Sequence, residues 1–164
     1  MWLQGSNKAG SVVGPPKLEG FLFVATEISQ ELLAAYQATE YWVGATPDPF
    51  CLYVGHRSAP LARLLDASGC GCAAFISAHN PFSEPRALDT NAVAHERLRQ
   101  ALDEQSTVLI EGVGRDAARL WPEEKSFLAI GLPLEEARQM GKRFGQNAIG
   151  WAGSDAVPRL ILLR

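Results

Sequence analysis

The stretch CAAFISAHNPFSE, residues 72–84, decides the fold because an apolar run of strand length ends abruptly in polar residues and a proline. Residues 72–76 carry apolar side chains on both faces, which is typical of a strand buried within a sheet. The Asn-Pro pair that follows favours a turn, since a residue before proline avoids the helical region. We therefore expect a buried strand that leads into a loop carrying His79, Asn80 and Ser83.

Amphipathic segments lie on either side of this strand. Ser29 and Ser58 are good N-caps for helices that extend to about Thr39 and to Gly69, where a left-handed residue usually ends a helix. Further helices are expected over residues 91–104, capped by Asp89 or Thr90, and over 133–144, beginning at Pro133. Strands are expected at residues 40–43, 50–55, 72–77, 107–114, 126–131, 148–153 and 159–163.

This order of elements predicts an α/β (α+β) fold. A mixed β-sheet of about five to seven strands would be covered by three or four helices in a single sandwich-like domain, because each one-sided helix must cover a sheet face. Residues 1–20 are rich in Gly, Ser and Pro and predict a loosely ordered leader, with residues 21–25 docking on the body. The globular domain is expected over residues 26–164.

Composition disfavours several classes of protein. The chain has 164 residues, 47% of them hydrophobic, which fits one soluble domain. A net charge of −3, with 15 basic and 18 acidic residues well mixed, disfavours nucleic-acid binding. No run of about 20 apolar residues predicts a membrane span. The odd set Cys51, Cys70 and Cys72 suits a reducing cytoplasm, and we interpret these thiols as core-lining, with no metal and no cofactor expected.

The loop after the buried strand is the expected site. If that strand and the strand ending near Glu111 run in the same direction, they bring SAHNPFS and GVGRD to one rim, where open α/β sheets hold ligands. His79 could switch its charge near neutral pH, and Arg115 could hold a carboxylate or phosphate. The alternative is turn chemistry alone, with Ser83 bonding to local backbone. GVGRDA superficially fits the Gly-x-Gly-x-x-Ala dinucleotide-binding fingerprint. That fingerprint requires a helix directly after it, and Pro122 comes too early for a helix of useful length.

Other polar residues allow more than one interpretation. Glu123 and Glu124 precede an expected strand, and Gln146 and Asn147 follow the last expected helix, so all four could be caps, turn formers or ligand contacts. His95 lies opposite the apolar stripe of its helix and is expected to face solvent.

A set of spaced motifs gives a resemblance. FISAHNPFS, Asn91, WPEEKSFLAIG and GKRFGQNAIGWA together resemble the family of small bacterial proteins called Domain of Unknown Function 3293, over about residues 34–149. Ser77 stands where that pattern usually has Thr, which keeps the hydroxyl. The family has no assigned activity, so the resemblance implies no reaction. It emphasises particular positions, which are Asn80, Pro81, Ser83, Asn91, Glu123 or Glu124, Ser126, Phe144, Gly145 and Gln146.

Two hypotheses of function follow. The first is a cytosolic ligand-binding module, or an interaction or regulatory module, built on a polar Asn/Ser/Gln cluster, with an unknown small molecule or protein as partner. The second is a small-molecule enzyme in which His79 performs acid-base chemistry with Glu123 or Glu124 on an anionic substrate. The candidate binding residues are His79, Asn80, Ser83, Asn91, Arg115, Glu123, Glu124 and Gln146.

Overall fold

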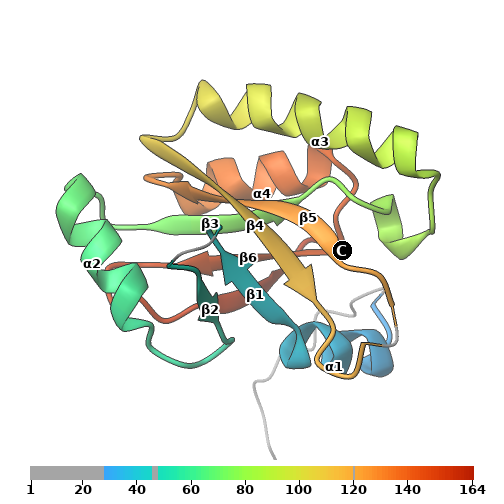
Figure 1. The fold of residues 1–164 in the computed structure, drawn as a ribbon, viewed down its shortest axis with the longest axis horizontal. Helices are drawn as coiled ribbons and strands as arrows, with labels where there is room; N and C mark the ends of the chain where they lie inside the picture. The colour runs from blue at the N-terminus through green and yellow to red at the C-terminus, as the bar shows by residue number, and fades with distance from the viewer. Residues whose placement is uncertain (1–27, 46–47, 120) are drawn as a thin grey trace, which may run out of the picture.

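The computed structural model describes residues 28–45, 48–119 and 121–164. The expected leader, the docking segment 21–25 and the expected domain start at residue 26 lie outside the described residues. In the remainder, seven strands form one sheet and four α-helices pack around it (Figure 1), so the α/β class and the numbers of strands and helices are confirmed. No helix of the described segments has the length and apolar character needed to cross a membrane.

The sheet has the strand order β2-β1-β4-β5-β3-β6-β7. Every neighbouring pair is antiparallel, so the parallel neighbours of a mixed sheet do not occur among the described strands. The strands are β1 (Glu40–Val43), β2 (Phe50–Leu52), β3 (Ala73–Ser77), β4 (Val108–Arg115), β5 (Glu124–Ile130), β6 (Ala148–Ala152) and β7 (Arg159–Leu162). The helices are α1 (Gln30–Ala38), α2 (Ala59–Ser68), α3 (Leu88–Asp103) and α4 (Leu134–Arg143), with a short 3-10 turn, η1 (Pro81–Ser83).

The helical crossovers explain why the sheet is antiparallel. Helix α3 connects β3 to β4, and these two strands run in the same direction with β5 between them. Helix α4 likewise connects β5 to β6 across β3. Each crossover therefore leaves room for one strand between the two that it connects. A strand antiparallel to both occupies that position. The segment from β3 to β6 is a split β-α-β-β-α-β unit, the ferredoxin-like arrangement.

A separate apolar core fills each face of the sheet. Side chains alternate along β3, so Ala74 and Ile76 face α3 and α4, while Ala73 and Phe75 face α2. Leu98 and Leu102 of α3 and Ala137 and Met140 of α4 complete the first core. Leu61 and Leu65 of α2 complete the second, together with Val43, Leu52, Leu128 and Ile130.

The helix ends follow the expected chemistry at three places and depart from it at a fourth. The Leu32 amide donates to Ser29 Oγ at 3.2 Å, the Leu61 amide donates to Ser58 Oγ at 3.3 Å, and Gly69 ends α2 with φ 65°. The expected cap of α3 at Asp89 or Thr90 is wrong. That helix begins at Leu88, because the Asn91 amide already donates to the Ala87 carbonyl at 3.0 Å, so Asp89 and Thr90 lie within the first turn.

Candidate functional site

Asn80, Asn91 and Glu124 form a hydrogen-bonded cluster at the C-terminal end of β3. The backbone amide of Asn80 donates to Asn91 Oδ1 at 3.0 Å, and Asn91 Nδ2 donates to Asn80 Oδ1 at 2.9 Å. Asn80 Nδ2 donates to Glu124 Oε1 at 2.9 Å, and the Arg86 amide donates to Asn80 Oδ1 at 3.0 Å. Asn91 is 4% exposed. These bonds join the end of β3 to α3 and to β5, so the cluster holds the loop in place.

Glu124 is the ionisable member of this cluster. Burial raises the pKa of its carboxyl above the ordinary value, and the hydrogen bond from Asn80 opposes that increase. Its position results from the topology, because β5 begins between the ends of β3 and β4, with Ser126 paired to both Ser77 and Gly112. The expected rim, in which those two strands run in the same direction, is therefore present, and β5 supplies its acid.

The loop at residues 80–83 has an uncommon backbone conformation. Asn80, Phe82 and Ser83 have φ angles of 44°, 58° and 59°, in the left-handed region that residues other than glycine rarely adopt. Asparagine is more tolerant of this region than phenylalanine or serine. Such a conformation persists only where the surroundings determine it. The bonds around the loop are therefore part of the reason that it keeps this shape.

A second cluster holds the other end of the loop. Ser83 Oγ and the Tyr36 hydroxyl share a hydrogen bond of 2.7 Å, and Asn147 Nδ2 donates to both oxygens, at 3.1 and 3.2 Å. Asn147 is 6% exposed, and its Oδ1 accepts from Arg164 Nη1 at 3.4 Å. Ser83 thus bonds to α1 and to the start of β6, and not to its local backbone alone. Sequence reasoning missed Tyr36, whose phenolic hydroxyl was the available signal for a polar role.

The segment after α4 holds the middle of the loop. Gln146 Nε2 donates to the His79 carbonyl at 3.2 Å and to the Phe144 carbonyl at 3.3 Å. The Phe82 amide donates to the Gly145 carbonyl at 2.7 Å. Gly145 has φ 68°, and a Cβ atom there would lie 2.9 Å from Pro81 Cβ, so glycine is required on both counts. The motif Phe144, Gly145 and Gln146 therefore lies beside the Asn-Pro motif.

His79 and His95 form a pair on the α3 side of the sheet. Their ring centroids are 5.9 Å apart, and His95 stacks on Phe127 at 4.3 Å. The expectation that His95 faces solvent is wrong, because it lies one turn after Asn91, on the helix face directed at β5. Both Nδ1 atoms are buried, and neither has a hydrogen-bond partner in the described part of the chain. Burial lowers the pKa of each imidazole, and each is lowered further by a neighbouring positive charge, Lys125 in both cases and His95 in the case of His79.

Arg115 and Glu123 lie apart from these clusters. Arg115 Nε donates to Glu123 Oε1 at 2.6 Å, and the guanidinium lies 5.7 Å from the centre of the Trp42 ring. No hydrogen bond or ion pair joins either side chain to the Asn80 cluster among the described residues. The sequence-predicted set is therefore divided: six of its members (His79, Asn80, Ser83, Asn91, Glu124 and Gln146) converge on one loop, while Arg115 and Glu123 pair with each other nearby.

The loop borders a groove with a volume of about 630 Å³ between α3 and α4. Volumes of about 300 to 1,000 Å³ are usual for small-molecule sites. Its more buried lining consists of small residues, Ala78, Ala94, Ala101 and Gly145, whereas its exposed rim is largely charged. The rest of the lining consists of Pro81, Phe82, Arg97, Gln100, Glu104, Lys142, Arg143 and Phe144. Sequence reasoning missed the basic residues, since a charged residue on a helix usually indicates only a solvated face.

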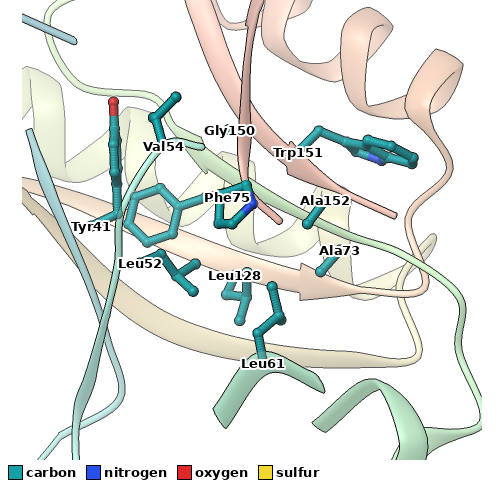
Figure 2. A pocket seen from close by; sticks show the side chains of 11 residues that line it. Tyr41, Leu52, Val54, Leu61, Ala73, Phe75, Leu128, Gly150, Trp151 and Ala152 are labelled. Atoms are coloured by element: carbon teal, nitrogen blue, oxygen red, sulfur yellow. The ribbon is translucent and has the colours of Figure 1, made fainter. Parts of the chain in front are cut away.

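A smaller hollow lies on the opposite face of the sheet (Figure 2). It is lined by apolar side chains that include Tyr41, Leu61 and Phe75, and the rings of Tyr41 and Phe75 meet edge to face at 5.2 Å. Its volume of about 10 Å³ is near the lower limit for a single water molecule. The described residues contain no group of three or more His, Cys, Asp or Glu side chains placed to hold a metal ion. The groove is therefore the better candidate site.

The comparisons with known proteins agree with the motifs. A family model described as "Protein of unknown function (DUF3293)" matches residues 76–149. The match begins in β3, and not near residue 34 as the resemblance implied, and it ends in β6. It includes α3, α4, the 80–83 loop and the groove, but not α1 or α2. No curated protein and no solved structure matches the chain.

Proposed function

We propose that this chain, which matches the DUF3293 family model over residues 76–149, is a ligand-binding module of the cytoplasm whose site is the groove between α3 and α4. Its polar Asn, Ser and Gln side chains hold the 80–83 loop as one wall of that groove. The free thiols of Cys51, Cys70 and Cys72 support a reducing compartment. A regulatory role would follow if the bound ligand changed how the module meets a partner.

The observation that carries the proposal is the convergence of the family motifs on a wall of the groove. Asn80, Asn91 and Gln146 come from three separate segments, and their bonds fix a loop that places Pro81 and Phe82 in the groove lining. A left-handed backbone at three non-glycine residues costs free energy, on the order of 1 to 3 kcal/mol each. Strain of this kind tends to occur at functional sites, where a fixed shape is required.

The enzymatic hypothesis has less support. General-base catalysis by His79 requires a carboxylate or a substrate within hydrogen-bond reach. In the described residues Glu124 bonds to Asn80, Glu123 pairs with Arg115, and neither is a partner of His79. His79 is also not among the side chains that line the groove. The binding module is therefore the function we put forward.

A ligand screen with a groove-filling variant tests the proposal. Ala94→Phe would place a ring in the groove, while Val93→Phe adds the same ring at the adjacent position, where the side chain is 52% exposed and outside the groove lining. We expect thermal-shift screening of polar metabolites to yield compounds that stabilise the wild type and the Val93→Phe protein alike. A ligand at about 100 times its Kd contributes about 2.7 kcal/mol.

The decisive readout is the loss of that stabilisation in the Ala94→Phe protein. Far-UV circular dichroism and the melting temperature without ligand establish that both variants are folded. Ligands that stabilise the wild type and the Ala94→Phe protein equally would place binding elsewhere and contradict the proposal.

A further inference from the structure

The charges around the groove indicate what kind of molecule it could hold. Three basic residues line it, Arg97 from α3 and Lys142 and Arg143 from α4, against one acidic residue, Glu104. The chain as a whole has the opposite sign, with a net charge of −3. The groove is thus locally basic on an acidic protein, which favours the approach of an anion.

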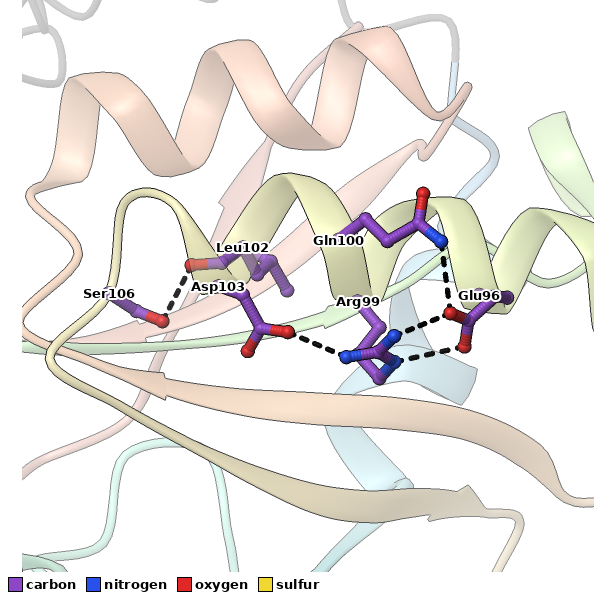
Figure 3. Close-up of polar contacts among 6 residues, drawn as sticks. All are labelled: Glu96, Arg99, Gln100, Leu102, Asp103 and Ser106. Carbon is purple, nitrogen blue, oxygen red and sulfur yellow. Dashed lines mark hydrogen bonds and ion pairs between the residues drawn. The ribbon is translucent and has the colours of Figure 1, made fainter.

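Two of these cations have no ion-pair or hydrogen-bond partner among the residues that the structure describes. Figure 3 shows Arg99 bound to Glu96 and Asp103 on the surface of α3. The N–O distances of these two ion pairs are 2.5 and 2.7 Å. Gln100, which does line the groove, also donates to Glu96. By contrast, the side chains of Arg97 and Lys142 form no ion pair or hydrogen bond with other described residues. They lie on the two sides of the groove, and both are exposed.

The apolar part of the lining has a different character. Phe82, from the loop, is 48% exposed, and Phe144 is a second aromatic residue in the lining. The alanines between the helices leave room for a flat apolar group. The guanidinium of Arg143 lies 5.5 Å from the centre of the Phe144 ring, so a cation and an aromatic surface occur together.

We propose that the occupant of this groove is an amphipathic organic anion. Its apolar body would lie on Ala94 and Ala101 against Phe82, and its carboxylate, phosphate or sulfonate group would bind Arg97 and Lys142 from the two helices. This inference rests on the proposed function, since it names the chemical class of ligand for the same groove.

A pair of fluorescent probes tests the charge requirement. Anilinonaphthalene sulfonate has an aromatic body and a sulfonate, and phenylnaphthylamine has the same body without the charge. We expect the sulfonate to bind the wild-type protein about tenfold more tightly than the neutral probe, because two exposed ion pairs can together supply a difference of that size. Fluorescence titration and calorimetry at low and high salt measure both affinities.

Three variants identify the residues involved. The double substitution of Arg97→Gln and Lys142→Gln should weaken sulfonate binding about tenfold and leave the neutral probe unchanged. Arg138→Gln, on α4 but outside the groove lining, should change neither affinity. Ala94→Phe should reduce the binding of both probes.

The possible failures differ from one another. If both probes bind equally, are insensitive to the double substitution and are lost with Ala94→Phe, the groove binds apolar bodies without regard to charge, and the anionic class is wrong while the proposed function stands. If neither probe is affected by Ala94→Phe, the groove is not a binding site, and the inference and the proposed function fail together.

Discussion

The two faces of the sheet are packed differently, although the same strands supply both. On one face, α2 directs Leu61 and Leu65 at the sheet and leaves a hollow of about 10 Å³. On the other, α3 and α4 share the surface, and the small residues Ala78, Ala94 and Ala101 leave a groove of about 630 Å³. The difference shows that a helical layer can be stable and still open, provided that its large side chains lie away from the seam between the helices.

The largest expected effect is on the closed face. Leu61 is fully buried, so Leu61→Ala should lower the free energy of unfolding by about 2 to 5 kcal/mol, through lost apolar burial and the cavity left behind. Ala94→Leu on the open face should change it by less than about 1 kcal/mol, because there is space for the added atoms. Urea unfolding measures both values. Equal losses at the two positions would contradict the contrast between the faces.

The next effect concerns the loop that borders the open face. Asn80→Gly permits the left-handed backbone but removes the bonds to Glu124, Arg86 and Asn91, and should cost about 1 to 3 kcal/mol. Asn80→Ala removes the same bonds and also places a Cβ atom on a left-handed backbone. That strain should cost a further penalty of about 1 to 2 kcal/mol. The difference between the two variants, measured by chemical unfolding, isolates the backbone strain. If alanine and glycine are equivalent at this position, the loop is not strained there.

A pH-dependent effect should arise on the α3 side. Burial lowers the pKa of His79 and of His95 in the folded protein, so below about 6.5, the ordinary value, the unfolded chain binds the protons more readily. The stability of the protein should therefore fall as the pH decreases from about 6.5 toward the lower folded pKa values. His79→Gln should flatten this decline, as followed by melting temperature against pH.

Glu124 should act in the opposite direction over the acidic range. The pKa of Glu124 is raised in the folded protein, so the folded protein binds a proton at this carboxyl more readily than the unfolded chain does. The contribution of Glu124 to stability therefore increases as the pH falls from the folded pKa toward 4.5, the ordinary value. Glu124→Gln should therefore make the decline steeper. A decline that neither substitution alters would assign the pH dependence to other groups.

The smallest effect distinguishes the two neighbouring arginines of α3. Arg99→Gln should lower the melting temperature slightly at low salt, because it removes the bonds to Glu96 and Asp103, and this change should diminish at high salt. Arg97→Gln should leave the melting temperature unchanged, since its side chain has no partner among the described residues. A loss of stability with Arg97→Gln would indicate a structural contact and weaken its assignment to ligand binding.

Local chemistry made much of the fold predictable from the sequence. Ser58 and Gly69 set the ends of α2 through bonds to residues close by, and the apolar run at residues 73–76 could only be a buried strand. The insertion of β5 between β3 and β4 was not predictable, because pairs such as Phe75 with Leu128 join residues far apart in the chain. Neither hydrophobic periodicity nor a turn motif indicates which strands β5 pairs with.

The site was predictable in its polar members but not in its function. Asn80, Asn91 and Gln146 were expected to form one cluster because buried amides need partners, and they do converge. Arg115 was expected beside them from strand direction alone, and its pairing with Glu123 depends on side-chain geometry. The groove was missed because it is formed by small residues, and an alanine in a helix gives no sign of whether the space above it is filled.

The skipped-strand topology has a practical consequence for work with shortened proteins. Residues 76–149 match the family, yet they lack most of β3, whose residues 73–77 pair with β5 along its length. A fragment cut at those limits would leave an unpaired and apolar strand edge, and edges of this kind associate with other chains. Domain boundaries for expression should therefore include the whole of β3, which pairs with β5, and the whole of β6, which pairs with β3.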